Sequence, residues 1–239
     1  MNSSKRCQWE VVFRFPSPFL EKSITNAEGL EFGLEFDTEK VEEGIILKGL
    51  SIITPILTKQ EASLFVWEKA NRIFDYLSAI HNYSIEGYLS KMVEVQPEGE
   101  VKTGYVESTV GLTIRESEAL DFNKDSIKRV LQNNDEKLAR QLSHFRRGLK
   151  TDDVIEKFRE FYLICEDVYP SGHQFLEDIK PVRHLLSHPE LNNPKHKATA
   201  KTLIGKGFLD PSNPRDMAAI KDYSNKTEKK AREIIKRKI

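Results

Sequence analysis

Apolar and polar residues alternate along the first part of the chain. Over residues 9–15 every second residue is Trp, Val or Phe, with Glu10 and Arg14 between them. Over residues 30–36 every second residue is Leu or Phe. A period of two is typical of strands with one buried face. Residues 45–54 continue as a more uniformly apolar strand, so the chain begins with a group of strands.

One helix and a further pair of strands are predicted next. Thr58 and Glu61 have the spacing of a capping box. The residues that follow place apolar side chains on one stripe: Ala62, Phe65, Ile73, Leu77 and Ile80. Residues 85–95 are expected to pair with residues 105–114 through the turn-forming Pro97-Glu98-Gly99. The helix can cover the sheet, and residues 1–118 are therefore assigned to a small β-rich α+β domain.

From about residue 121 the period becomes helical. The first expected helix covers residues 135–150. The second is expected to start at a Thr151 cap, the third at a capping box of Ser171 with Gln174, and the fourth at Pro214. Pro189 is expected to stop the third of these helices. Residues 121–239 are thus assigned to an antiparallel helical bundle, and the fold class of the chain is α+β.

The composition is that of an ordinary soluble protein. Of the 239 residues, 38% are hydrophobic and 31% charged, which argues against disorder. The first residues carry no apolar secretory core, and no stretch is apolar enough to span a membrane. Cys7 and Cys165 lie far apart, without the spacing of a metal site. We expect a cytoplasmic protein with reduced thiols.

Charge is distributed unevenly between the two parts. Residues 1–120 hold 12 Lys and Arg against 19 Asp and Glu, whereas residues 121–239 hold 25 against 18. The basic part ends in the lysine-rich segment 226–238. An acidic partner such as nucleic acid would fit this asymmetry, and so would a solvated basic helix.

The candidate chemistry lies in the segment Arg183-His184-Leu185-Leu186-Ser187-His188. Its polar residues fall on the last turn of an amphipathic helix, whose apolar seam is expected to comprise Phe175, Ile179, Val182 and Leu186. A histidine at a helix end can act as a general acid or base, and an arginine can stabilise charge on a phosphorane. Arg183 and His188 converge only if the helix ends between them or if two copies face each other.

Two other interpretations of this segment remain open. His184 and His188 are spaced to bind a metal from one helix face, but no third ligand follows nearby. An Arg and a His at a helix end can also simply cap the terminal carbonyls. Signatures for phosphate loops, dinucleotide binding and nucleophile elbows are absent. No metal or cofactor is expected.

An Arg followed by a polar residue, a short mostly apolar spacer and a His resembles the Arg-x(4–6)-His signature of HEPN domains (the higher eukaryotes and prokaryotes nucleotide-binding superfamily). The resemblance covers roughly residues 121–239. It implies metal-independent endoribonuclease activity in active members, with two copies pairing so that both motifs line one cleft. By this resemblance Arg183 is the phosphate-contacting arginine, His184 occupies the polar position after it, where Asn or Asp is common, and His188 is the catalytic histidine.

The whole chain also resembles the uncharacterised proteins grouped with methylamine-utilisation protein J and the Apea-like HEPN proteins. This resemblance depends on the helix at residues 70–80 after a β-rich start and on two later segments, Phe145-Arg146-Arg147-Gly148-Leu149 and Ile155-Glu156-Lys157-Phe158. It supports the architecture more than any activity.

These observations predict an RNA- or nucleotide-binding protein that pairs as a homodimer through its helical domain. Cleavage of RNA is assigned to Arg183, His184 and His188. Contacts with nucleic acid are assigned to Arg146, Arg147, Lys229 and Lys230, for which solvated helix surface is the alternative. A catalytically inactive module that binds nucleotide, RNA or protein is the alternative function.

Overall fold

The chain is α+β, as predicted. A computed structural model describes residues 6–21, 33–42, 44–95, 101–106, 130–131, 135–187, 194, 197–198, 201–202, 205 and 209–239. The chain divides into two compact units, Met1–Glu136 and Lys137–Ile239. The domain boundary expected at residues 118–121 lies outside the described residues.

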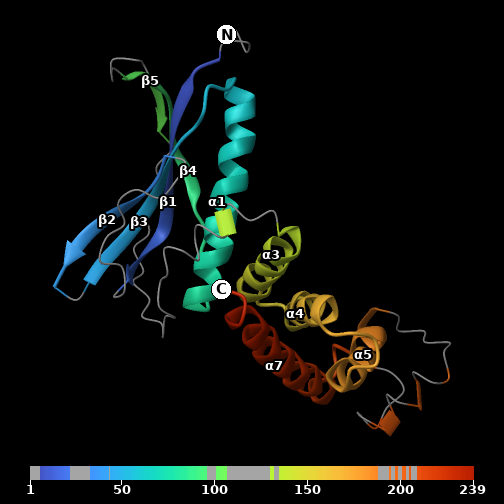
Figure 1. Ribbon diagram of the computed structural model, residues 1–239. Helices are drawn as coiled ribbons and strands as arrows, with labels where there is room; N and C mark the ends of the chain where they lie inside the picture. The colour runs from blue at the N-terminus through green and yellow to red at the C-terminus, as the bar shows by residue number, and fades with distance from the viewer. Residues whose placement is uncertain are drawn as a thin grey trace. The chain divides into compact units, whose positions relative to one another are not determined.

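The first unit contains a five-stranded antiparallel sheet with the strand order β2-β3-β1-β4-β5 (Figure 1). The strands are β1 (Gln8–Glu21), β2 (Leu34–Val41), β3 (Gly44–Ile53), β4 (Tyr88–Val95) and β5 (Val101–Val106). The segment that ends at Val95 pairs with a following strand, as predicted, but that strand begins at Val101 rather than Tyr105, with Val95 opposite Val101. The predicted turn at residues 97–99 and the remainder of the predicted strand, residues 107–114, lie outside the described residues.

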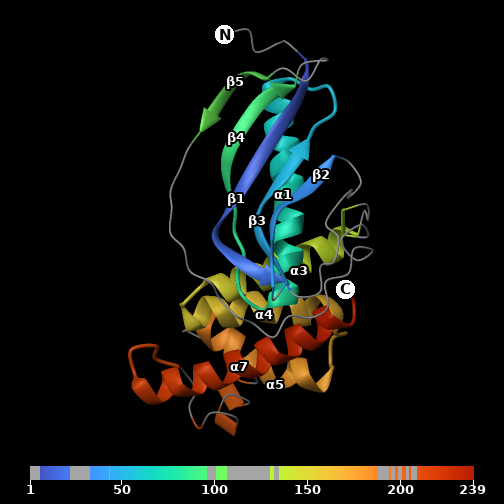
Figure 2. The same ribbon diagram turned by 90° about the vertical axis from the view of Figure 1, so that its left-hand side faces the viewer.

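Helix α1 (Lys59–His81) covers one face of this sheet (Figure 2). The predicted capping box is confirmed, since Thr58 accepts from the Glu61 amide and the Glu61 side chain accepts from the Thr58 amide. On the covered face, the fully buried Phe13 ring meets the rings of Trp67 and Phe74 edge-on, with centroids 4.8 and 5.9 Å away. Burial of alternate β1 residues thus joins the sheet to its helix.

The second unit is helical in its described residues (Figure 1). Its long helices are α3 (Glu136–Lys150), α4 (Val154–Val168), α5 (Gln174–Ser187) and α7 (Pro214–Lys236). Helix α4 is central, because Phe158, Phe161 and Ile164 are fully buried and the helix packs on both α5 and α7. Within the described ranges, no helix combines the length and hydropathy that a membrane span requires.

The start of α7 was predicted correctly, but the cap of α4 was not. Asn213 caps α7 and Pro214 occupies its first turn. The predicted Thr151 cap of α4 is wrong, because Asp153 Oδ1 accepts from the amides of Ile155 and Glu156 at 2.8 and 3.1 Å. Thr151 instead accepts from the amide of Asp153, the residue that precedes the helix. A carboxylate at the cap also interacts favourably with the helix dipole.

Helix α5 starts at Gln174, so the predicted capping box of Ser171 with Gln174 is wrong. His173 takes the capping position instead: its carbonyl accepts from the Leu176 amide, and its Nδ1 accepts from the Phe175 amide at 3.2 Å. The His173 ring also stacks on Tyr169, with centroids 4.0 Å apart. His173 thus fixes the start of α5.

The buried seam of α5 differs from the expected one by one position at each end. Leu176, Ile179, Val182 and Leu185 are 0–6% exposed, whereas Phe175 and Leu186 are half-buried. Each end of the seam offers two adjacent apolar residues, and a hydrophobic pattern alone does not decide which of the two faces the core. As a result, Phe175 is available to line the surface of the second unit.

We expect the substitution Gly148→Ala to destabilise the second unit by about 1–3 kcal/mol. A Cβ at this position in α3 would lie 2.8 Å from two ring atoms of the fully buried Phe161. At an open helical site the same change would stabilise the helix by up to about 1 kcal/mol, so the sign of the effect tests the close approach of α3 and α4. Urea unfolding measures it, with Lys137→Ala at an exposed α3 position as the control; a Gly148→Ala protein as stable as the parent would contradict the packing.

Candidate functional site at the end of helix α5

Arg183 lies immediately before the last turn of α5 and is half-buried. Its guanidinium carbon lies 5.3 Å from the centre of the Tyr162 ring on α4. A cation over an aromatic face is attracted by the ring quadrupole, and this contact restricts the guanidinium without consuming its hydrogen-bond donors. The arrangement presents a positioned arginine fork whose donors can bind an anion.

The aromatic platform under Arg183 is itself fixed. Tyr162 is 2% exposed, and its hydroxyl donates to Glu166 Oε1 at 3.1 Å. Burial raises the pKa of the Tyr162 hydroxyl, and the Glu166 carboxylate raises it further. The hydroxyl therefore stays protonated at neutral pH and keeps its hydrogen bond to Glu166.

A second guanidinium group, absent from the sequence predictions, approaches the same helix end. Arg159 on α4 donates to the carbonyl of Leu186 at 3.4 Å and pairs with Glu156. It precedes Tyr162 by three residues and so lies on the same face of α4. Packing of α4 on α5 thus brings Arg159 to the end of the helix that carries Arg183, although the two residues are far apart in sequence.

The two predicted histidines differ in what the structure describes. His184 is half-buried on the last turn of α5, whereas His188 lies outside the described residues. The described part of helix α5 runs to Ser187, so the expected end of the helix between Arg183 and His188 falls outside the described residues. No group of three or more His, Cys, Asp or Glu residues in the described part of the chain could hold a metal ion, so the metal interpretation of His184 gains no further ligand there.

Of the two arginines predicted on α3, Arg146 is half-buried and Arg147 is exposed. Arg147 Nε lies 3.4 Å from Glu160 Oε2, and the same oxygen lies 2.7 Å from His144 Nδ1. Glu160 on α4 thus contacts both Arg147 and His144 of α3. Arg147 is thereby tied to a carboxylate, while half of its side chain, 52%, stays exposed. Nucleic-acid contacts of Arg146 and Arg147 stay predictions.

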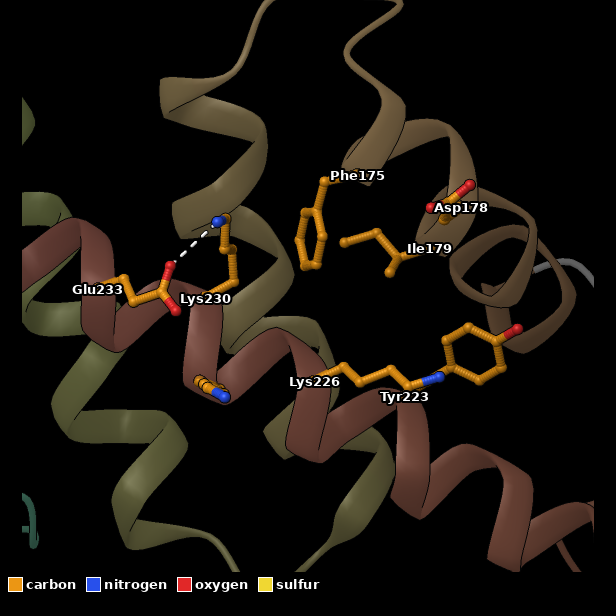
Figure 3. Close-up of a pocket in the computed structure, with 8 residues that line it drawn as sticks. Phe175, Asp178, Ile179, Tyr223, Lys226, Lys230 and Glu233 are labelled. Atoms are coloured by element: carbon orange, nitrogen blue, oxygen red, sulfur yellow. Dashed lines mark hydrogen bonds and ion pairs between the residues drawn. The ribbon is translucent and has the colours of Figure 1, made fainter.

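The two predicted lysines, Lys229 and Lys230, line a groove of about 520 Å³ between α5 and α7 (Figure 3). The α5 and α7 residues that form this groove are Phe175, Asp178, Ile179, Tyr223, Lys226, Lys229, Lys230 and Glu233. We refer to it as the lysine groove. Its aromatic members escaped the sequence predictions because Phe175 had been assigned to the core.

Charges in the lysine groove are partly balanced. Lys230 Nζ binds Glu233 at 3.0 Å, and this hydrogen bond raises the pKa of Lys230 and lowers that of Glu233. Burial, followed by the nearby Asp178 carboxylate, raises the pKa of Tyr223. Lys226 Nζ lies 5.1 Å from the centre of the Tyr223 ring. The groove therefore combines ammonium groups with aromatic rings that stay uncharged at neutral pH.

Comparison with known proteins gives no match to a family model, a curated protein or a solved structure. Function is therefore inferred from the side chains of the second unit. Two places there combine cations with aromatic rings: the end of α5 at Arg183, and the lysine groove.

Proposed function

We propose that the second unit is a HEPN-type module that binds RNA and cleaves it without a metal ion, using Arg183 and His188. The observation that carries the proposal is the Arg183 guanidinium over Tyr162, 5.3 Å from the ring centre, near the end of α5. Arg159 adds a second cation at the same helix end. Two guanidinium groups near one point favour a phosphate ligand.

In this reaction His188 removes the proton from a ribose 2′-hydroxyl. The 2′ oxygen then attacks the adjacent phosphorus, the bond from phosphorus to the 5′ oxygen breaks, and that oxygen receives a proton. The products are a 2′,3′-cyclic phosphate and a 5′-hydroxyl. Arg183 stabilises the negative charge that develops on the phosphorane.

Pairing of two copies through the second unit suits this chemistry. In an in-line displacement the attacking and leaving oxygens lie on opposite sides of the phosphorus. A single imidazole reaches both sides poorly, whereas the His188 of a second copy can protonate the leaving oxygen. The proposal therefore includes a homodimer in which two copies of the segment from Arg183 to His188 line one cleft.

Cleavage in the presence of EDTA tests the proposed function. Purified full-length protein is incubated with a labelled single-stranded RNA, and with DNA of the same sequence, in EDTA. The proposal predicts that the RNA is cut and that the DNA, which lacks the attacking 2′-hydroxyl, stays intact. Cleavage that disappears on addition of EDTA, or that extends to the DNA, would contradict it.

A catalytically inactive RNA-binding module is the second candidate, and one observation favours it. Arg159 donates a hydrogen bond to the Leu186 carbonyl, as a residue that caps a helix end does. If Arg183 served the same purpose, the parent protein would bind RNA and leave it uncut. The EDTA experiment separates the two candidates, because bound but intact RNA supports the inactive module.

A further inference from the structure

We propose that the lysine groove is a binding subsite for single-stranded RNA, in which a base stacks on an aromatic ring and the adjoining phosphates contact lysines. The inference rests on the proposed function only in taking RNA as the ligand. It concerns residues separate from Arg183 and His188, and it does not require that the bound strand be cut.

The walls and floor of the lysine groove suit a planar base. Phe175 and Ile179 extend from α5 toward α7, and Tyr223 stands on α7 (Figure 3). Ile179 is 1% exposed and forms an apolar floor, whereas Phe175 and Tyr223 are half-buried and keep part of each ring accessible. The volume of about 520 Å³ falls within the usual range for small-ligand sites, about 300–1,000 Å³.

The lysines of the groove suit phosphates. Lys226 and Lys229 are exposed and stand three residues apart on α7. Neither forms an ion pair with any residue in the described ranges, whereas Lys230 is neutralised by Glu233 at 3.0 Å. Asp178 is the other carboxylate in the lining. Lys226 and Lys229 are thus the lysines whose ammonium groups can bind the phosphates of a nucleic-acid backbone.

The present contacts of the lysines show how ring and cation are coupled. Lys226 Nζ lies 5.1 Å from the centre of the Tyr223 ring, and Lys230 Nζ lies 5.9 Å from the centre of the Phe175 ring. A base that stacks on a ring would displace the ammonium group that lies over that ring. The displaced ammonium group would then bind the phosphate of the same nucleotide. Aromatic rings next to lysines are the usual composition of single-strand binding surfaces.

The same composition favours a single strand over other polyanions. In a duplex the bases stack on each other, and their faces are not available to a protein ring. An acidic peptide would satisfy the lysines and leave the rings of Phe175 and Tyr223 without partners of matching shape. Stacking on a ring is tolerant of base identity, so the inferred subsite binds single-stranded RNA with little sequence preference.

Fluorescence anisotropy with a labelled 2′-O-methyl oligoribonucleotide tests the subsite, because this strand has no free 2′-hydroxyl and cannot be cut. Tyr223→Ala is expected to weaken binding about tenfold, whereas Tyr223→Phe keeps the ring and the affinity. The double variant Lys226→Gln/Lys229→Gln is expected to flatten the dependence of log K on log salt by about 1.4. Lys221→Gln/Lys236→Gln removes the same charge from exposed positions of α7 outside the groove and serves as the matched control.

Each outcome bears on the subsite separately from the proposed cleavage. Equal affinities of the parent, Tyr223→Ala and the lysine double variant would overturn the subsite, and so would an equal loss in the control variant. Poly-glutamate that binds as tightly as the oligonucleotide would also overturn it. Far-UV circular dichroism and thermal unfolding confirm that each variant is folded. Failure of the proposed function appears instead as uncut unmodified RNA and leaves the anisotropy result standing.

Discussion

Replacement of Arg183 by alanine is expected to slow RNA cleavage about 100- to 1,000-fold, the usual effect of removing a group that stabilises transition-state charge. The fold should tolerate the change, because the side chain is half-buried and its described contact is the Tyr162 ring at 5.3 Å. Single-turnover rates on a labelled RNA measure the effect. Arg183→Lys keeps the charge but loses the planar fork, so its rate should lie between those of the parent and the alanine variant.

Arg215→Ala is the matched control for this experiment. Arg215 is exposed in the first turn of α7, and its removal takes one guanidinium from the same unit. The parent rate is expected for Arg215→Ala. If Arg183→Ala cleaves as fast as Arg215→Ala, Arg183 does not stabilise the transition state, and the site lies elsewhere.

Replacement of His188 by alanine is expected to reduce the cleavage rate about 100- to 10,000-fold, because water alone would then transfer protons to and from the reacting oxygens. Binding of the 2′-O-methyl oligonucleotide should be unchanged, since this variant keeps Tyr223, Lys226 and Lys229 of the lysine groove. The two measurements on one variant therefore separate chemistry from affinity. A His188→Ala protein that cleaves at the parent rate would contradict the assignment.

Mixing the Arg183→Ala and His188→Ala proteins extends this prediction to the homodimer. A mixed pair keeps one Arg183 and one His188 in the shared cleft, whereas each variant alone has lost both copies of one of these residues, so the mixed pair is expected to regain part of the activity. Either variant alone stays inactive, which provides the control. A mixture that stays inactive while co-purification through a tag on one variant shows mixed dimers would contradict the shared cleft.

Local sequence signals predicted the elements that have local causes. The capping box of Thr58 with Glu61 and the start of α7 at Pro214 depend on residues within one turn, and both are confirmed. The cap of α5 was missed because the Nδ1 of His173 binds an amide only once its ring is positioned, here by stacking on Tyr169. A histidine in sequence carries no signal for that arrangement.

The candidate site shows the same limit. The sequence indicated Arg183 through its motif and Lys229 with Lys230 through their charge. Arg159 was missed because only the packing of α4 on α5 carries its side chain to Leu186. Phe175 was placed in the core because it and the adjacent Leu176 are equally apolar, so the sequence pattern did not distinguish them. Tertiary packing buries Leu176 and leaves Phe175 half-buried.

The chemistry of the new RNA ends tests the central claim most directly. Purified parent protein is incubated in EDTA with a defined single-stranded RNA, and the mass of each fragment is determined, with the His188→Ala protein as the control preparation. The account predicts fragments that end in a 2′,3′-cyclic phosphate and begin with a 5′-hydroxyl, formed by the parent alone. Intact RNA, ends with a 3′-hydroxyl and a 5′-phosphate, or equal cleavage by the His188→Ala preparation would contradict it.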